Sequence, residues 1–376
     1  MMQQKRSFPI GISILLILAI LGLVLVVRRF LYGLGAVSNL SDGRPWGFWI
    51  SFDLYTGVAL AAGGFTMAGA VYIFNLKKYH PVVRPAILTA FLGYILVILA
   101  LLVDIGAPWY IWHPMIYQNW HSPLLEVALA VMTYTLVLAL EFSPAVFERL
   151  NWHAPMRVIR AIQIPLVVAG IAISTGHQSS LGTMLLLMPE ALHPLWYTPI
   201  LPILFLTSAI AVGPAVVILE STLSSKVFGH KLGSDVLSGL AKAISYILGL
   251  YLVLKIADLA VRGDLGLIFS ASPVNLLWWG EMIIGVILPM IIFFMPGVRQ
   301  SSRGIFVGAL LVILGLIFNR FNVSMLALAI RPGYAYSPHW MEVGISAGLV
   351  AWALLVIWLA FRFLPIASNS HKEAPV

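Results

Sequence analysis

The chain lacks cysteine and is poor in charge. None of its 376 residues is cysteine, so it offers no thiolate ligand for an iron–sulphur cluster and forms no disulfide. Any such cluster must therefore belong to a partner protein. Charged residues make up 10% of the chain, against about 25% in an average soluble domain.

Apolar residues take the place of the missing charges. They make up 61% of the chain, and its mean hydropathy is +0.98. A soluble protein of this length could not bury so much apolar surface in its core. The simpler explanation is that membrane lipid surrounds much of the chain. The net charge of +8 does not indicate a nucleic-acid partner, because the basic residues stand in short loops between apolar runs. The composition excludes a soluble enzyme, a disordered chain and a nucleic-acid-binding domain.

The apolar runs predict an all-α polytopic membrane protein with about ten transmembrane helices. Each run approaches the ~20 residues that cross a bilayer as a helix. The first run exceeds the ~7–15 residues of a signal-peptide core, so we expect it to stay in the protein as a helix. The predicted spans cover residues 9–31, 47–75, 85–107, 123–147, 157–176, 198–222, 237–262, 275–296, 303–319 and 340–364.

Lysine and arginine predict the orientation of the chain in the membrane. About fifteen of them lie on the side of the N-terminus and about six on the opposite side, so the positive-inside rule places both termini in the cytoplasm. The loops 108–122, 177–197 and 320–339 then face outward. They are rich in Trp, Tyr, His and Pro, and their aromatic side chains suit a surface on which a partner docks.

Three ionisable residues fall at the outer ends of consecutive predicted spans. These are Asp104, Glu126 and His177. Ionisable groups in a membrane helix are expensive and indicate function by default. We expect the three to converge on a shared ligand or proton site; the alternative is three separately solvated boundary residues.

One further polar pattern has a structural explanation. Lys255, Asp258 and Arg262 share one helix face at i, i+3 and i+7, which predicts a structural ion pair.

The histidines do not predict a haem site. A haem held by two histidines needs them well inside facing helices. Of the nine histidines, His177 alone abuts a predicted span from within. We therefore expect neither haem nor a metal site in this chain.

Short motifs recur in a fixed order along the chain, at residues 33–40, 44–53, 79–81, 84–85, 104–106, 139–144, 147–150, 177–182, 193–196 and 333–336. In this order they resemble the NrfD-like (polysulphide reductase) family of membrane subunits, and within it the HybB-type subunits of nickel–iron hydrogenases. The likeness runs from about residue 28 to 365. Ala107 departs from it, because many family members carry an arginine shortly after the Asp104-Ile105-Gly106 motif.

This resemblance implies an architecture. Eight central helices would form two four-helix bundles, with additional outer helices at the ends, in a single integral membrane domain over residues 1–376. The first helix and an outer loop would occupy residues 1–45, the first bundle 46–176 and the second bundle 197–320. Residues 321–376 would supply an outer loop, the last helix and a cytoplasmic tail. The implied location is the bacterial inner membrane.

The resemblance also implies a function. The chain would anchor a respiratory nickel–iron hydrogenase and pass electrons from a periplasmic ferredoxin-like iron–sulphur subunit to membrane quinone. That subunit would be fed by the large and small hydrogenase subunits. Menaquinone or ubiquinone would be the substrate, and the chain itself would hold neither haem nor an iron–sulphur cluster.

Site residues follow from combining this function with the outer polar residues. A quinone carbonyl needs a hydrogen-bond donor, and its reduction needs protons. His177 and Asp104 are the expected contacts to the quinone ring, with His121 and Gln178 nearby. His177 is the preferred donor because imidazole can both hydrogen-bond and relay protons.

A proton path is expected along the fourth span. Thr133 and Glu141 lie within roughly 60° of Glu126 on the helix wheel, and Glu126 to Glu141 covers about 22 Å of the helix length. Tyr134 or water would bridge the gaps. Asp53, near the outer start of the second span, is a further expected proton-transfer residue. If Glu141 instead only hydrogen-bonds near the cytoplasmic surface, no such path exists.

Two rival functions stay open. The same fold could anchor a molybdenum reductase and oxidise quinol. Alternatively, two helical bundles with charges inside could form a secondary transporter, although the outward skew of the polar residues argues against it. Co-purification of a nickel protein, a molybdenum protein or no redox partner would separate the three.

Overall fold

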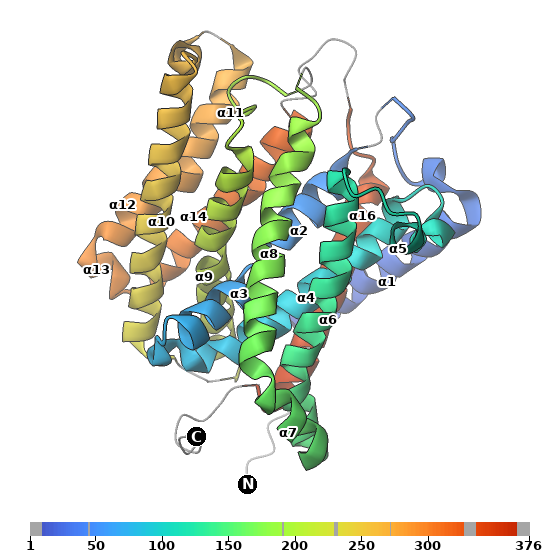
Figure 1. The fold of residues 1–376 in the computed structure, drawn as a ribbon, viewed down its shortest axis with the longest axis vertical. Coiled ribbons are helices and arrows are strands. Elements are labelled where there is room, and N and C mark those ends of the chain that lie inside the picture. Colours follow the sequence, from blue (N-terminus) through green and yellow to red (C-terminus); the bar gives the residue numbers. More distant parts are fainter. Residues whose placement is uncertain are drawn as a thin grey trace.

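The structure is a computed structural model that describes residues 10–43, 46–189, 192–228, 232–270, 272–326 and 336–366. Within these ranges the regular structure is helical (Figure 1). Nine helices there are long and apolar enough to cross a membrane, and a bent pair raises the number to as many as ten. The prediction of an all-α polytopic membrane protein is confirmed.

The first helix group packs in chain order. A broken helix covers Ile50–Ile73, and it packs on α4 (His80–Asp104). Next, α6 (Pro123–Leu150) packs between α4 and α8 (Gln163–Leu186). The pieces of the broken helix are η2 (Ile50–Thr56), α2 (Gly57–Leu60), α3 (Gly63–Ala68) and η3 (Gly69–Ile73).

The second helix group follows a similar order. Here α9 (Leu201–Phe228) packs on α10 (Ser234–Val261) and on α14 (Ser302–Phe321), which continues as η8 (Asn322–Leu326). Its remaining span is built from α11 (Pro273–Met282), η7 (Ile283–Ile287) and α12 (Leu288–Phe294). Because α9 also packs on α3 and α8, the two groups share a broad interface. Their description as two bundles remains a proposal.

The first and last long helices form a pair of their own. In this pair α1 (Ile10–Tyr32) packs along α16 (Trp340–Phe363), and α16 also contacts α4. A Cβ added at Gly22 would lie 2.6 Å from the Cα of Gly348, so the two backbones touch at this point. Small residues permit such close helix contacts in lipid.

Short helices connect the spans. Around the first group these are η1 (Leu34–Ala36), η4 (Lys77–Tyr79), η5 (Pro108–Tyr110), α5 (His113–Ile116) and α7 (His153–Ala161). The second group has η6 (Leu265–Phe269) and α13 (Pro296–Arg299). Figure 1 places α7 at the opposite end of the molecule from the segment that joins α8 to α9.

The predicted fifth span is displaced in the structure. Its first part is α7, which is bent by 60° from α8. In turn, α8 continues to Leu186, ten residues beyond the predicted end at 176. The prediction that His177 ends the span and opens an outer loop is therefore wrong. The polar run from Ser174 to Ser180 resembles a helix end in sequence, but four of its side chains are buried inside the helix group: Ser174, His177, Gln178 and Ser180.

Candidate functional site

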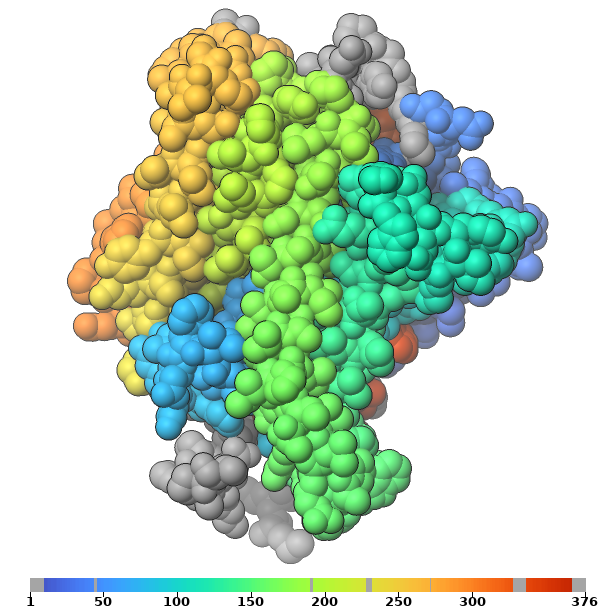
Figure 2. Space-filling model, in the orientation of Figure 1, coloured from blue at the N-terminus to red at the C-terminus, as the bar shows by residue number. Residues whose placement is uncertain are grey.

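A cavity opens between α6 and α8 beside the 108–122 segment. Its volume is about 560 Å³, and its walls include Trp120, His121, Glu126, Thr133 and His177. Figure 2 shows the 108–122 segment in teal, protruding from the helical body next to α8 in green. Small-molecule sites in proteins are commonly clefts of roughly 300–1,000 Å³, so this cavity is large enough for an aromatic ring with substituents.

His177 is the buried titratable residue of this cavity. Its side chain has no exposed surface, and its Nδ1 lies 2.9 Å from the hydroxyl of Tyr94. Nε2 of the same ring is buried and has no hydrogen-bond partner among the described residues. Buried polar atoms are nearly always paired, so this ring nitrogen is available to hydrogen-bond with a ligand or water that enters the cavity.

Two tyrosines stand behind His177. The rings of Tyr94 and Tyr134 meet edge to face at 4.8 Å between centroids, and both are fully buried. Glu141, farther along α6, acts electrostatically on Tyr134, and its carboxylate lies beside Gly170 of α8. The order His177, Tyr94, Tyr134, Glu141 therefore leads from the cavity into the first helix group.

Glu126, Thr133 and His121 reach the cavity from the α6 side. All three line it and are exposed. The Thr133 hydroxyl donates to the Leu129 carbonyl of its own helix at 2.7 Å, so its proton is already engaged. The structure thus brings together four of the residues expected from the sequence, including His177.

Gln178 lies away from this cavity. Its side chain is buried, and its Nε2 donates to the Val58 carbonyl of α2 at 2.9 Å. Successive helical residues point about 100° apart, so the neighbour of His177 faces the broken helix. In this structure Gln178 ties α8 to α2.

Asp104 and Asp53 also lie elsewhere, in a second polar cluster. Asp53 accepts a hydrogen bond from Ser346 of α16 at 2.6 Å. Asp104 interacts electrostatically with Asp53, Arg29 and Glu342. The expected convergence of Asp104 with Glu126 and His177 is therefore not what the described structure has, because α1 and α16 cover the end of α4 where Asp104 lies.

Arg29 supplies the positive charge of this second cluster. Its side chain is buried, and it donates to the carbonyls of Val103 at 2.6 Å and Ile105 at 2.5 Å. Arg29 falls inside the predicted span 9–31, and the sequence did not single it out. In the structure its guanidinium brings a positive charge from α1 to the end of α4.

Glu342 of α16 is a further acidic residue of the second cluster. It accepts hydrogen bonds from the backbone of Asn39 at 2.9 Å and His339 at 3.0 Å, and from the hydroxyl of Tyr336. Burial, and then this carboxylate, raise the pKa of the Tyr336 phenol above its usual range. Tyr336 therefore stays a neutral donor at physiological pH.

The histidines of the described residues do not fit a haem with two histidine ligands. Such a haem needs two buried imidazoles on facing helices. Within these ranges His177 is fully buried, whereas the other described histidines are partly or fully exposed: His80, His113, His121, His153, His193 and His339. His230 and His371 lie outside the described residues.

Tyr94 is the functional candidate that the sequence did not single out. A lone tyrosine in the apolar run of α4 has no spacing motif, and only its depth in the span could have marked it. Arg320 was likewise read as a loop residue, although it is 1% exposed within α14. A charge directly after the predicted span 303–319 resembles a span end unless the helix is known to continue.

Known proteins resemble the chain along most of its length. Residues 36–332 match the family described as polysulphide reductase, NrfD. A protein of Nitratidesulfovibrio vulgaris (strain Hildenborough) is 41% identical over 95% of each chain. The probable Ni/Fe-hydrogenase 2 b-type cytochrome subunit of Escherichia coli K12 is 36% identical over 95% of this chain and 93% of the relative.

A third relative is named for quinone chemistry. The menaquinone reductase integral membrane subunit of Nitratidesulfovibrio vulgaris is 33% identical and covers 92% of this chain and 88% of its own. The two relatives with functional names are thus subunits of redox enzymes. Because the family match extends over both helix groups, the chain belongs to the polysulphide reductase NrfD family.

Proposed function

We propose that the chain is the quinone-reactive membrane subunit of a respiratory nickel–iron hydrogenase complex. It accepts electrons from a periplasmic iron–sulphur subunit and delivers them to menaquinone or ubiquinone. The observation that carries this proposal is the 560 Å³ cavity whose wall holds His177 with an unpaired Nε2. The similarity to a hydrogenase subunit supports the choice of partner.

The geometry of His177 suits a quinone carbonyl. When the Tyr94 hydroxyl donates to Nδ1, the neutral imidazole carries its proton on Nε2. This nitrogen then donates to a quinone oxygen and hands over the proton as the ring is reduced. Glu126, in the same cavity wall, is placed to supply the second proton.

Replacing His177 by Ala tests this role. Hydrogen-driven quinone reduction by the purified complex should fall about 100-fold or more, the range typical of a lost general acid. Hydrogen oxidation with a soluble dye should stay normal, because the dye does not need the membrane site. His153→Ala, at an exposed histidine of α7, is the control. Normal quinone reduction in His177→Ala would reject the assignment.

The partner is expected to dock on the aromatic 108–122 segment. Trp109, Tyr117 and Trp120 are 66%, 69% and 74% exposed there. Exposed aromatic side chains are common anchors of protein interfaces. The other expected docking loops lie partly outside the described residues, which omit 190–191 and 327–335.

A second candidate keeps the quinone site and changes the partner. In it the chain anchors a molybdenum reductase and oxidises quinol. The match to a family named for polysulphide reductase and the menaquinone reductase relative favour keeping it. Purification of the tagged chain from mild detergent should bring down nickel under the first proposal and molybdenum under the second. Family membership gives no support to secondary transport.

The prediction that this chain holds no haem stays open. The name of the Escherichia coli relative includes a b-type cytochrome, whereas the described histidines do not form a buried pair. An absorption spectrum of the purified chain, oxidised and then reduced with dithionite, would settle the matter. A haem b band that disappears in His177→Ala would place the ligand at the proposed quinone site and reject that site.

A further inference from the structure

A third polar cluster is buried in the second helix group and has no role in the proposed quinone chemistry. At its centre Glu281 of α11 is 1% exposed. Its carboxylate accepts hydrogen bonds from Trp196 at 2.8 Å, Asn319 at 2.7 Å and Asn322 at 2.8 Å. Three donors, one from the segment between α8 and α9 and two from the continuous helix α14–η8, hold a carboxylate where lipid would otherwise exclude it.

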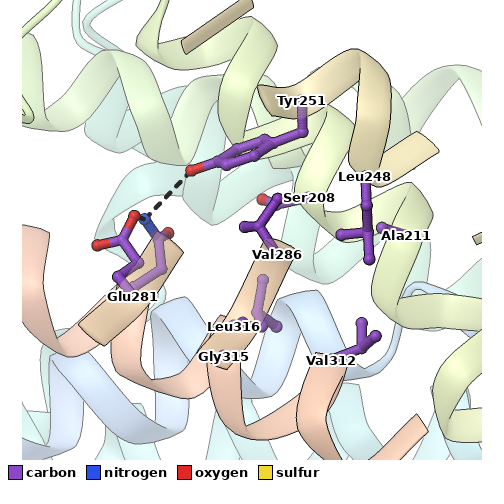
Figure 3. Close-up of a pocket in the computed structure, with 11 residues that line it drawn as sticks. Ser208, Ala211, Leu248, Tyr251, Glu281, Val286, Val312, Gly315 and Leu316 are labelled. Carbon is purple, nitrogen blue, oxygen red and sulfur yellow. Dashed lines mark hydrogen bonds between the residues drawn. The ribbon is translucent and has the colours of Figure 1, made fainter. Parts of the chain in front are cut away.

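Glu281 borders a small cavity. Figure 3 shows Glu281 and Tyr251 at one end of it and Leu248, Ala211 and Val312 toward the other. The dashed line is the 3.4 Å hydrogen bond from Asn319 to the Tyr251 hydroxyl. The cavity has a volume of about 30 Å³, which is room for about one or two water molecules. It therefore suits water and is too small for a quinone.

Arg320 anchors the far side of the cluster as a fixed cation. It donates to Asn319 at 2.7 Å and to Ser208 at 2.8 Å, both of which line the cavity, and it stacks over the Phe205 ring at 3.7 Å. Arginine does not release its proton under ordinary conditions. Arg320 therefore compensates the charge of Glu281 without exchanging protons.

Lys255 of α10 is a second buried cation near Glu281. It is 1% exposed, and the charges that act on it are Glu281, Asp258 and Arg262. No hydrogen bond or ion pair joins its ammonium group to another residue of the described structure. A buried ammonium without a fixed partner is costly, so it needs either water or the loss of its proton.

Asp258 connects Lys255 to the molecular surface. Its carboxylate accepts from Thr198 at 2.6 Å and from Arg262 at 3.0 Å, and Arg262 also pairs with Asp264. The side chains of Arg262 and Asp264 are 20% and 29% exposed. The expected ion pair of Asp258 with Arg262 is confirmed. Lys255 takes no part in this ion pair and is more deeply buried than Arg262.

We propose that Lys255 is a proton-exchanging residue that links Glu281, beside the water-sized cavity, to the Asp258–Arg262–Asp264 charges at the surface. In the transfer step an Nζ–H bond of the ammonium breaks, a water molecule between the two groups relays the proton, and an O–H bond forms on Glu281. A neutral amine and a carboxylic acid result, and the total charge is unchanged. Hydronium that arrives from the Asp258 side then re-forms the ammonium and leaves as water, while the O–H bond of Glu281 breaks and its proton converts a cavity water to hydronium.

A purely structural lysine would behave differently from a proton carrier. If only its positive charge mattered, Lys255→Arg would be tolerated, because arginine keeps the charge. A proton carrier fails in Lys255→Arg and in Lys255→Met alike, since neither side chain exchanges a proton. Lys242→Arg, at an exposed lysine on the same helix, is the matched control.

Proton movement per electron is the first readout. The complex purified with its redox partners is sealed into vesicles that enclose a pH-sensitive dye, and turnover is started with quinone. Both Lys255 variants should lower the protons moved per electron by about tenfold or more, and Lys242→Arg should match the wild type. A wild type that moves no protons overturns the proposal. So does a normal Lys255→Arg beside an impaired Lys255→Met.

A second readout uses the wild-type chain. It requires neither quinone turnover nor a variant that assembles with the redox partners. In the full wild-type chain with isotope-labelled lysine, NMR should show one lysine Nζ that exchanges with solvent although its side chain is protected, and that converts between ammonium and amine with pH. A buried lysine that stays charged and does not exchange overturns the proposal. A chain that shows this exchange but does not reduce quinone would lose the proposed function and keep this site.

Discussion

The Tyr94 hydroxyl lies 2.9 Å from Nδ1 of His177. This contact joins α4 to α8 inside the first helix group and fixes the ring whose other nitrogen faces no protein partner. A hydrogen bond to one imidazole nitrogen decides which tautomer the ring adopts. Tyr94 is thus a positioning residue for His177.

Tyr94→Phe should slow quinone reduction by about fivefold to tenfold, the worth of a hydrogen bond of about 1 kcal/mol. Dye-linked hydrogen oxidation should not change. Tyr246→Phe, at an exposed tyrosine of α10, provides the control. Steady-state rates with a soluble quinone would check this, and equal rates for wild type and Tyr94→Phe would contradict it.

Glu141 is expected to carry protons behind the two tyrosines. In sealed vesicles Glu141→Gln should reduce the membrane potential formed during quinone reduction by about tenfold, because the amide cannot relay a proton. A potential-sensitive dye measures this. Glu148→Gln, in the same helix but paired with Arg84 near the surface, should behave as wild type. Full potential in Glu141→Gln would exclude it from the path.

Gly22→Val should separate α1 from α16. A Cβ at Gly22 would lie 2.6 Å from the Cα of Gly348, whereas a Cβ at Gly11 in the same helix would meet nothing within 4 Å. Overpacking of this kind costs about 1–3 kcal/mol. Thermal unfolding in detergent should show a lower midpoint for Gly22→Val and an unchanged one for Gly11→Val. Equal midpoints would mean that the two helices do not pack this way.

The missing cysteines make the orientation easy to measure. With no native thiol, Asn119→Cys in the 108–122 segment and Arg157→Cys in α7 each introduce a single label site at an exposed position. If the positive-inside prediction holds, a membrane-impermeant maleimide should label Asn119→Cys in intact spheroplasts and Arg157→Cys only after lysis. The reverse pattern would invert the topology.

Trp109→Ala should weaken partner binding. A central aromatic anchor contributes about 2 kcal/mol or more, which is roughly a 30-fold loss of affinity. Co-purification of the iron–sulphur subunit measures this. Trp352→Ala, at an exposed position of α16, is the matched control, and equal recovery in the two variants would remove the 108–122 segment from the interface.

Hydropathy predicted the spans because every helix that crosses the lipid needs about 20 mostly apolar residues. Hydropathy could not predict the breaks in the helix Ile50–Ile73 or the extension of α14 through η8. A local change of helix type leaves the composition of a segment unchanged. The bend between α7 and α8 shifted the fifth span for the same reason.

The polar residues show where sequence reasoning stops. The position of a residue along its span gives its depth in the membrane. Glu126, His121 and His177 were therefore expected at a similar depth, and the structure brings them to one cavity. Depth in the membrane does not show which helices are neighbours. Asp104 shares that level, but Arg29 of α1 and Glu342 of α16 surround it.

The hydrogen bond from Trp196 to Glu281 also constrains how the protein is made. Lys255 and Arg320 would each add about 3 kcal/mol to the insertion of an isolated helix. The donors to Glu281 come from two other segments, the one that holds Trp196 and the helix α14–η8. The helices of the second group therefore cannot leave the insertion machinery one at a time at low cost. They are expected to wait at its lateral gate until α14 arrives, so truncation before α14 should yield chains that quality-control proteases remove.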